Sequence, residues 1–316
     1  MADYMGRGGK VSVGEDSSTW GTAGTPDRCF YTFSTDISTM MNVEFREALN
    51  EGLTGSVVSS FVNNGIDVGG TFEVEPAYEG FGLILYHALW GTTATSGTNP
   101  YTHTYTLAAT PPALGLTVEQ VNGNNTAEKF AGCRVSTLEL TVSARGRMRA
   151  RVSVIGKSGG GRTSATSTSV TTNHTPIQGY HAGSIGWNSL TWRTVDLALK
   201  VDNRFERQPL LGTQYTGEPF IAGPRVVTVT ATVIYDADTA YSGFTAGTQS
   251  DFTVTFTSGS ASMAWTLHNA VITECSAPVN KHGRIMQTLT LRGVSDGTDN
   301  GVSIVVINTQ SSRVAA

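Results

Sequence analysis

Charged residues are scarce in this chain of 316 residues. Asp, Glu, Lys and Arg together make up 15% of it, against about 25% in an ordinary soluble domain. The formal net charge is −4, so the chain has no excess of positive charge. Tight binding of nucleic acid through its phosphates, or of an acidic membrane surface, is therefore not expected.

Cysteines and long apolar segments are equally rare. The three cysteines, Cys29, Cys133 and Cys275, lie far apart and are odd in number, which argues against a disulfide framework and against zinc-ligand spacing. The longest apolar candidate, Phe81–Trp90, is about half of the ~18 residues that a membrane-spanning helix needs. Residues 1–13 hold no apolar core typical of a signal peptide. We therefore expect a protein that is made in a cytoplasm, does not bind membranes and stays soluble until it meets its partners.

Signals of catalysis are also weak. The six histidines form no HExxH motif and no cluster with the spacing of metal ligands. Ser158 stands in a G-x-S-x-G pattern, but a Gly/Ser-rich stretch follows it where a nucleophile elbow requires a helix. The sequence therefore predicts no catalytic residue, no metal site and no cofactor, and a protein that is not an enzyme.

Glycine, serine and threonine are abundant, with 36 glycines alone. Many segments alternate apolar and polar residues, which is typical of half-buried strands, and turn residues separate them. The sequence therefore predicts a mainly β fold. The length favours about two domains, at ~150 residues for each.

An internal repeat supports two tandem domains. Gly146-Arg147 and Gly283-Arg284 each stand at an expected hairpin, and the strand that follows each hairpin ends at a glycine, Gly156 or Gly293. Both pairs of glycines are 137 positions apart (283 − 146 and 293 − 156). We expect the hairpin glycines to supply the positive φ of a three-residue loop.

Two further segments extend the repeat upstream. Gly70–Glu75 alternates in the same way as Val227–Thr232, and Thr102–Thr106 alternates in the same way as Thr253–Thr257. The predicted division is an N-terminal arm at 1–28, a domain at 29–157, a linker or long loop at 158–176, a second domain at 177–310 and a C-terminal tail at 311–316. The arm is expected to order only on a neighbouring molecule.

One amphipathic helix is expected, in the first domain. Apolar residues from Phe81 to Leu89 follow helical spacing, Pro76 suits a position near the start, and Gly91 suits the end. The second domain has Asp238–Tyr241 at the corresponding place, for which we expect about one turn.

In this order, several segments of the sequence resemble those of the tail tube (major tail) proteins of long-tailed bacteriophages. The resemblance covers most of residues 15–310 and depends on pattern and order. The segments that carry it are Ser18–Ala23, a strand around Ile37–Glu44, Gly69–Glu73, the helix before Leu89-Trp90-Gly91, Tyr101–Tyr105, and Gly132–Val135 with its Gly-Arg hairpin, followed in the second copy by Ile185–Asn188 and Leu190–Trp192.

The resemblance implies a β-sandwich or partial barrel in each domain, and subunits that form rings. Stacked rings would make a hollow tube through which DNA is ejected into the host without sequence-specific binding. A duplicated chain would form such a ring from three copies with six similar domains. The implied location is the virion tail, and the other implied partners are the tape-measure protein and the tail-end proteins of the same virion.

A lumen that passes DNA should be lined by acidic or hydroxyl side chains, because Lys or Arg would hold phosphate. The polar faces of the expected strands supply candidates: Thr71, Glu73, Glu75, Glu139, Thr228, Thr230 and Thr232. Arg147, Arg149 and Arg151 also alternate onto one face. We expect these arginines to pair with Glu73, Glu75 or Glu139, locally or across subunits, and Arg284 is the corresponding candidate in the second copy. A solvated outer strand face is the alternative for the arginines.

Other functions remain open at the level of sequence. The alternatives are another virion protein, such as a capsid decoration protein or a minor tail protein, and a carbohydrate-binding β-sandwich. The last would need an exposed aromatic platform, which the sequence does not place.

Overall fold

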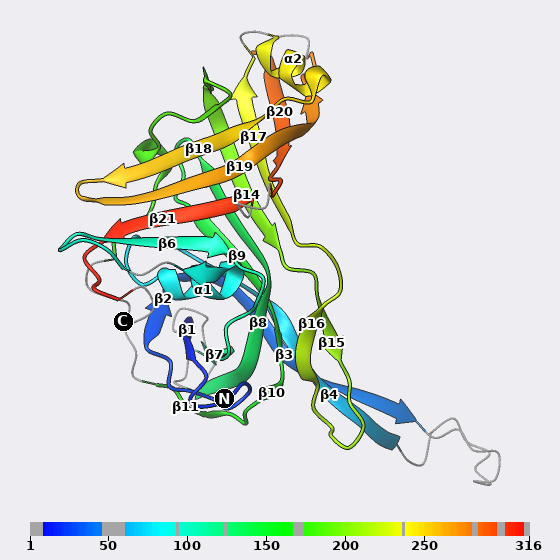
Figure 1. Ribbon diagram of the computed structural model, residues 1–316. Helices are drawn as coiled ribbons and strands as arrows, with labels where there is room; N and C mark the ends of the chain where they lie inside the picture. Colours follow the sequence, from blue (N-terminus) through cyan, green and yellow to red (C-terminus); the bar gives the residue numbers. More distant parts are fainter. Residues whose placement is uncertain are drawn as a thin grey trace.

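The structure is a computed structural model that describes residues 9–45, 61–92, 95–122, 126–166, 174–235, 238–279, 284–295 and 301–312. In these residues the chain consists mainly of antiparallel strands with two short α-helices (Figure 1). The expected mainly β fold is therefore confirmed.

The elements divide into an N-terminal half and a C-terminal half. The N-terminal half contains β1 (Lys10–Glu15), β2 (Arg28–Phe30), β3 (Thr32–Phe45), β4 (Phe61–Val74), α1 (Gly82–Leu89), β5 (Trp90–Thr92), β6 (Tyr101–Leu107), β7 (Leu116–Val121), β8 (Thr126–Ser143), β9 (Arg149–Gly156), β10 (Ser158–Gly159) and β11 (Thr163–Ser164). The C-terminal half contains the 3₁₀ turn η2 (Gly179–His181), β12 (Gly186–Trp187), β13 (Leu190–Thr191), β14 (Thr194–Asp202), β15 (Phe205–Gln208), β16 (Gly217–Ile221), β17 (Val226–Ile234), α2 (Thr239–Ala246), β18 (Gln249–Ser258), β19 (Ala261–Ser276), β20 (Met286–Arg292) and β21 (Val302–Asn308).

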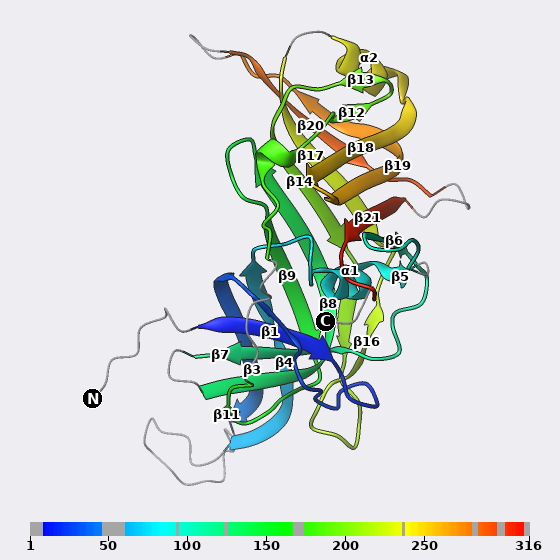
Figure 2. The same cartoon turned by 90° about the vertical axis from the view of Figure 1, so that its left-hand side faces the viewer.

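One antiparallel sheet, which we call the long sheet, runs through both halves. Its strands follow the order β3, β4, β9, β8, β14, β17, β20 and β19. The two halves meet where β14 pairs with the end of β8, from Asp196 opposite Ser143 to Asp202 opposite Thr137. Figure 2 shows β8 and β9 of the N-terminal half continuing along the molecule into β14, β17 and β20 of the C-terminal half. A single apolar core cluster accordingly includes residues of both halves, such as Leu138 and Leu199.

A second layer of strands covers the apolar face of the long sheet. The long strands β8 and β19 bend, so that each of them belongs to the second layer at its start and to the long sheet at its end. The first part of β8 pairs with β7, β10 and β11, and β7 pairs with β1. The first part of β19 pairs with β18 and β21, and β12 pairs with β18. Each half is therefore a two-layered β-sandwich.

The bends of β8 and β19 have the same cause. Gly132 and Asn269 both adopt the left-handed conformation, with φ of 67° and 48°. A bulge follows each of them, between Val135 and Thr137 in β8 and between Ile272 and Glu274 in β19. Bulges and left-handed residues bend a strand at a defined position, so the same bend is built at the same place in both halves.

The first strand of each half of the long sheet shares a bulge as well. In β3 the register shifts between Thr32 and Ser34, and in β14 it shifts between Thr194 and Asp196. The strands β3, β4, β9 and β8 thus correspond in order and irregularities to β14, β17, β20 and β19. The two halves share one topology.

The structure differs from the sequence-based division in its assignment of β5 and β6. The strands β5 and β6 belong to the N-terminal half in sequence, but β6 pairs with β21 and so extends the second layer of the C-terminal half. The strand that follows α1 and pairs with β8 is β7, just as β18 follows α2 and pairs with β19. Thr102–Thr106 therefore does not correspond to Thr253–Thr257, as the shared alternation had suggested.

The helix α1 lies beside the second layer with most of its side chains buried. It ends at Leu89 because the next residue, Trp90, adopts a left-handed φ of 77°. The expected stop at Gly91 was therefore one residue late. In the C-terminal half, α2 spans eight residues, longer than the single turn expected there, and ends at the left-handed Gly247.

The halves are also joined by a cluster at the end of α1. Arg225, which precedes β17, donates hydrogen bonds to the carbonyl oxygens of Ala88 and Ala108 at 2.9 and 2.7 Å. Its guanidinium lies 3.6 Å from the ring centroid of Trp90. Asn203 is fully buried and donates to the carbonyl oxygens of Ala88 and Val135. A cation at the carboxyl end of a helix interacts favourably with the helix dipole.

Part of the expected N-terminal arm belongs to the second layer. Residues 10–15 form β1 between β2 and β7, with Val11 and Val13 fully buried. The Asp16 carboxylate then accepts hydrogen bonds from the backbone N–H of Gly21 and from the hydroxyl of Thr117, both at 2.8 Å. These contacts hold residues 16–24 against the sandwich. The prediction of an N-terminal arm is therefore wrong for residues 10–28, and residues 1–8 lie outside the described residues.

Part of the expected linker is also ordered. Ser158–Gly159 and Thr163–Ser164 form β10 and β11 along the edge of β8, and Ile177 is fully buried. Residues 167–173 lie outside the described residues. The strands β10 and β11 pair with the first part of β8 on the edge away from β7, as β21 pairs with β19.

Burial of His87 in α1 makes the stability of the subunit dependent on pH. Burial lowers the pKa of His87, and this outweighs the raising effect of Glu15, whose Oε1 lies 3.5 Å from Nε2, and of Asp16, while Arg134 lowers the pKa further. The folded state therefore keeps a neutral imidazole while the unfolded state gains a proton below pH 6.5. Stability is complete above this pH and is lost as the pH falls towards the lowered value in the folded state.

We expect the free energy of unfolding of the unassembled subunit to fall by up to about 1.4 kcal/mol for each pH unit below 6.5. The measurement is urea denaturation at pH 7.5, 6.5 and 5.5. Replacement of His87 by Phe removes the titrating group, so its pH dependence in this window should be flatter. Equal slopes for the wild type and His87→Phe would contradict the assignment. Glu15 titrates at lower pH, because the neighbouring His87 lowers its pKa from the ordinary value.

Candidate assembly surfaces

The polar face of the long sheet carries most of the candidate lumen residues. Thr71, Glu73, Glu139, Thr228, Thr230 and Thr232 are all partly exposed and project from this face. Successive strands place their polar residues directly opposite one another. One cross-strand row, which we call the charged row, runs through Glu73, Arg151, Glu139, Lys200 and Thr228.

Positive and negative side chains alternate along the charged row. Arg151 lies between Glu73 and Glu139, and Lys200 of the C-terminal half lies on the other side of Glu139. Arg149, on the same face, donates to Glu73 at 3.0 Å and lies 4.4 Å from the ring centroid of Phe33. Exposed ion pairs contribute only about 0–1 kcal/mol to stability, so the main effect of this arrangement is to neutralise the cations of the face.

Glu75 does not lie on this face. It follows the end of β4 and is 3% exposed, because the chain turns into the sandwich at Pro76. Its carboxylate oxygens accept hydrogen bonds from Arg147 at 2.9 Å and from Nε2 of His174 at 3.1 Å. The placement of Glu75 in a lumen-facing row is therefore corrected. Arg147 turns to this carboxylate and away from the stripe that the sequence suggested, and both ion pairs, with Glu73 and with Glu75, form within one chain.

The repeat-marking glycines serve packing more than backbone conformation. Gly146 closes its turn with a hydrogen bond from its N–H to the carbonyl oxygen of Ser143, at 3.0 Å, without a positive φ. A Cβ on Gly156 would lie 2.9 Å from a methyl group of Val68, and a Cβ on Gly293 would lie 2.6 Å from the Gly301 carbonyl oxygen. Gly283 lies outside the described residues. Arg284 is exposed just before β20.

The outer parts of β3 (residues 40–45) and β4 (residues 61–67) project from the same end of the long sheet as the connection β14–β17. These outer parts of β3 and β4, which we call the arm, extend beyond the sandwich (Figure 1). The connection β14–β17 contains the hairpin β15–β16, which lies against the arm. Ile66 donates its N–H to the carbonyl oxygen of Gln214 at 2.7 Å, and Thr216 donates to Asp67 at 2.7 Å. The arm and the hairpin β15–β16 brace each other.

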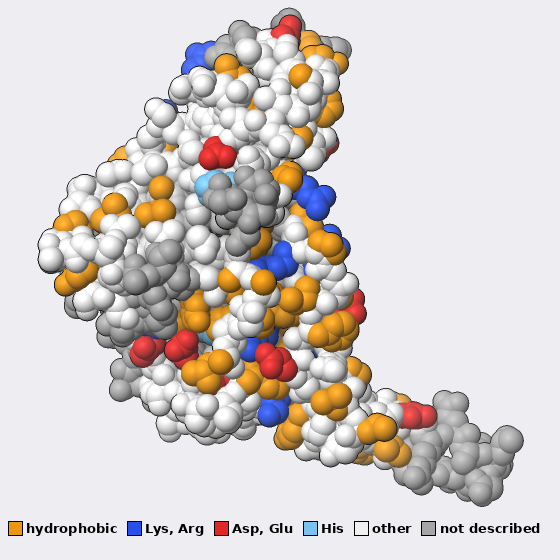
Figure 3. Space-filling model, viewed as in Figure 1, with side chains coloured by type: hydrophobic (Ala, Val, Ile, Leu, Met, Phe, Trp, Pro, Cys, Tyr) orange, Lys and Arg blue, Asp and Glu red, His pale blue; other side chains and the backbone are white. Residues whose placement is uncertain are grey.

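Exposed apolar side chains gather on the arm and on the hairpin β15–β16 (Figure 3). They are Met40, Met41, Val43, Phe45, Phe61, Val62, Leu210, Leu211, Phe220 and Ile221. Phe45 and Phe61 lie opposite each other and are each 61% exposed. Exposed apolar side chains gathered in this way are typical of a site of contact with another protein.

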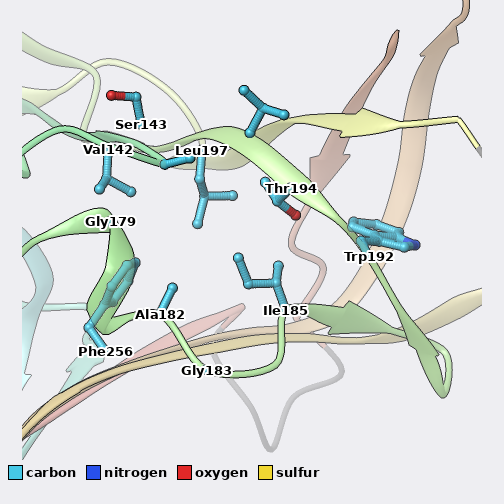
Figure 4. A pocket seen from close by; sticks show the side chains of 12 residues that line it. Val142, Ser143, Gly179, Ala182, Gly183, Ile185, Trp192, Thr194, Leu197 and Phe256 are labelled. Atoms are coloured by element: carbon cyan, nitrogen blue, oxygen red, sulfur yellow. The ribbon is translucent and has the colours of Figure 1, made fainter. Parts of the chain in front are cut away.

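The pocket of Figure 4 offers no group suited to catalysis. The pocket of Figure 4 lies between the β8–β14 junction and the segment after η2, and it is lined mainly by apolar side chains such as Val142, Ile185, Trp192, Leu197 and Phe256. No acid, base or thiol lines it. Ser158 of the G-x-S-x-G pattern lies in β10, with β11 following in place of a helix.

Comparison with protein families places these surfaces in context. A family model described as phage tail tube protein matches residues 6–293. The chain belongs to the phage tail tube family. No curated protein matches the chain.

As a tail tube protein, the chain is a structural component of the virion tail. This agrees with the resemblance found in the sequence. The described residues of the tail tube protein hold no group of three or more His, Cys, Asp or Glu side chains placed to bind a metal ion. None of its described helices has the length and apolar character needed to cross a membrane.

Sequence reasoning missed part of the polar face of the tail tube protein. Lys200, Asp196 and Asp202 of β14 were not identified, because β14 was not aligned with an earlier strand. These residues are four and two positions apart in an alternating segment, which places them on one face of a strand, and this was the available signal. The exposed apolar residues of β3, such as Met40, Met41 and Val43, were missed as well, because they do not alternate as a half-buried strand does. The segment 47–67, which includes Phe61 and Val62 of the arm, was already a candidate for contacts between rings.

Proposed function

We propose that three copies of the tail tube protein form a ring of six similar sandwiches, and that rings stack into the tube that conducts DNA during ejection. The observation that carries this proposal is the junction of β8 with β14, where two sheets of the same topology continue into one sheet. Repetition of such a junction between copies would extend the long sheet around a channel. A closed sheet has no free edges.

The polar face of the long sheet is proposed to line the lumen. Its threonines present hydroxyl groups, and its Arg149 and Arg151 lie beside carboxylates. A lining that is rich in hydroxyl groups and locally neutralised does not hold phosphate strongly. DNA would therefore pass without sequence-specific binding.

The arm and the hairpin β15–β16 are proposed to make the contacts between rings. Both project from one end of the sheet, and both expose apolar side chains that a second ring would bury. The tape-measure protein inside the tube and the tail-end proteins at its ends would be further partners in the same virion. The protein would be synthesised in the cytoplasm of the bacterial host.

Electron microscopy of the purified protein tests the proposal. We expect rings with threefold symmetry, six similar lobes and a central channel, alone or stacked into tubes. A protein that stays monomeric at high concentration, with or without preformed tube fragments as seeds, would refute it.

A charge reversal in the charged row tests the assignment of the lumen. Glu139→Lys would place three cations side by side, since Glu139 lies between Arg151 and Lys200. We expect particles to assemble in normal numbers but to eject DNA several-fold more slowly, with the defect decreasing as salt is raised. The measurement is the rate of DNA release from purified particles.

Glu128→Lys is the matched control for this variant. Glu128 lies on the same strand, β8, but in the part that pairs with β7 in the second layer. It should eject DNA at the wild-type rate. Equal rates for Glu139→Lys and the wild type would remove this face from the lumen.

A further inference from the structure

Two edges of the long sheet are unpaired in the described residues. β3 pairs with β4 along one edge, and no strand pairs with the other. At the opposite end of the sheet, the Glu274–Ser276 segment of β19 pairs with β20 only. We call these the β3 edge and the β19 edge. Unpaired backbone N–H and C=O groups in a row are ready to bind another strand.

The junction between β8 and β14 shows how such edges fit together. β19 corresponds to β8, since the left-handed residues and the bulges of the two strands coincide at a constant separation of 137 positions (269 − 132 and 272 − 135). β14 corresponds to β3 at a separation of 162 positions, because their bulges coincide (194 − 32 and 196 − 34). The β19 edge is therefore equivalent to the part of β8 that pairs with β14, and the β3 edge is equivalent to β14.

We propose that the β19 edge of one copy pairs antiparallel with the β3 edge of the next copy, with Ser276 directly opposite Ser38. In the internal junction the equivalent pair is Glu139 opposite Lys200. The same register places Cys275 opposite Thr39 and Glu274 opposite Met40. This inference rests on the proposed ring and assigns the strands and the register of its contact between copies.

The contact between copies is shorter than the internal junction. Pro278 stands where β8 has Thr141, and proline lacks the N–H that a ladder needs. The ladder should therefore end at Ala277 opposite Ile37, whereas the internal junction continues to Ser143 opposite Asp196.

The apolar groove beside the β19 edge supports a second copy as the occupant. Cys275, Ala277 and Val279 line this groove together with Tyr241 and Ile285, and Val279 is 79% exposed. The equivalent residues of β8 are Leu138, Leu140 and Val142, which lie opposite Val201, Leu199 and Leu197 of β14 and are buried. The chain therefore covers the apolar residues of β8 with β14, whereas the equivalent apolar residues beside β19 stay open.

Cysteine pairs distinguish contacts between copies from contacts within one copy. The β3 and β19 edges are separated by seven strand spacings of ~4.8 Å, roughly 30 Å, so Ser38 and Ser276 of one chain cannot form a disulfide. Directly opposite residues in an antiparallel pair are close enough for one, with Cα atoms about 4.5–5.5 Å apart. Both serines are exposed, so their replacement should not disturb folding.

The experiment uses Ser38→Cys/Ser276→Cys in the full chain, with Cys275→Ser to remove the neighbouring thiol. Assembled protein is oxidised mildly and run on a denaturing gel with and without reductant. We expect covalent trimers as the largest product, and their conversion to monomers by reductant. Glu139→Cys/Lys200→Cys is the positive control, because it should form the equivalent disulfide within one chain and yield monomers of altered mobility.

A shifted pair tests the register. Ser38→Cys/Glu274→Cys, also with Cys275→Ser, places the thiols on the same face but two residues out of register, about 7–8 Å apart. It should cross-link at least fivefold less than the matched pair. Equal or stronger cross-linking of the shifted pair would overturn the register, and covalent chains longer than trimers would overturn closure of the ring by three copies.

Failure of this inference can be separated from failure of the proposed function. Rings seen by electron microscopy without any cross-link would overturn the β3–β19 contact and leave the ring itself in place. Absence of rings from the unsubstituted protein would overturn both.

Discussion

Replacement of Phe45 and Phe61 by aspartate is expected to yield single rings that no longer stack into tubes. The phenyl side chains of Phe45 and Phe61 lie opposite each other on the arm, and both are largely exposed in the subunit. Full burial of a phenylalanine side chain contributes about 1.5–3 kcal/mol. Loss of both contacts, with two carboxylates in their place, should weaken ring stacking at least ~100-fold for each subunit contact. The measurement is the ratio of rings to tubes by electron microscopy and sedimentation.

The control for this variant keeps the apolar character of the arm. Phe45→Leu/Phe61→Leu should still form tubes, at a modestly higher protein concentration. Normal tubes from the aspartate variant would show that the arm does not join rings. Loss of the rings themselves would place the arm in the contact between neighbouring copies within a ring.

Arg225→Ala is expected to destabilise the folded subunit by about 3 kcal/mol. The change would remove a donor from the carbonyl oxygens of Ala88 and Ala108 and from the side-chain oxygen of Asn203, leaving Asn203 as the remaining donor to Ala88. Buried acceptors that lose their partners are costly. It would also remove the guanidinium from the face of Trp90. Burial lowers the pKa of Arg225 to about 9, because desolvation disfavours the charged guanidinium.

Thermal and urea unfolding of the unassembled subunit measure this effect. The Arg225→Lys variant keeps the charge but not the planar donors, and should recover only part of the stability. Arg204→Ala is the matched control: Arg204 lies in the neighbouring connection and pairs with Asp202 at the surface. It should change stability by no more than about 0.5 kcal/mol. An equally small effect of Arg225→Ala would show that the cluster does not hold the halves together.

The repeat was visible in the sequence because close packing fixed a few of its residues. The packing at Gly156 and Gly293 excludes a side chain, so both glycines mark the end of a strand in the alternating pattern. The bend of β8 and β19 was less visible, since one copy uses Gly132 and the other uses Asn269. Both residue types adopt the left-handed conformation readily, so the shared conformation does not require a shared residue.

Alternation alone did not identify every pair of equivalent strands. Thr102–Thr106 and Thr253–Thr257 look alike because each has one buried and one wetter face, yet β6 and β18 occupy different places in the second layer. The same limit applies to Glu75, where the alternation of β4 was extended one residue past the strand. A period of two reports partial burial, and only pairing partners report position in a sheet.

The sequence predicted a polar strand face for the candidate site, but not all of the residues that lie on it. The polar strand faces pointed to Thr71, Glu73, Glu139 and the threonines of β17, and the structure brings these residues onto one surface. Lys200 could not be assigned, because its position opposite Glu139 follows from the contact between the two halves. The arm depends on exposure of apolar residues, which composition and periodicity do not reveal.

The arm and the hairpin β15–β16 differ in sequence, length and apolar side chains although they stand at equivalent places in the two halves. In a ring of three such chains, long and short projections would alternate around the circumference. The end of the tube would then have threefold symmetry and not six identical binding sites. A trimeric terminator could therefore bind it in only one distinct orientation about the tube axis. Gene duplication would in this way reduce the symmetry that every later component of the tail has to match.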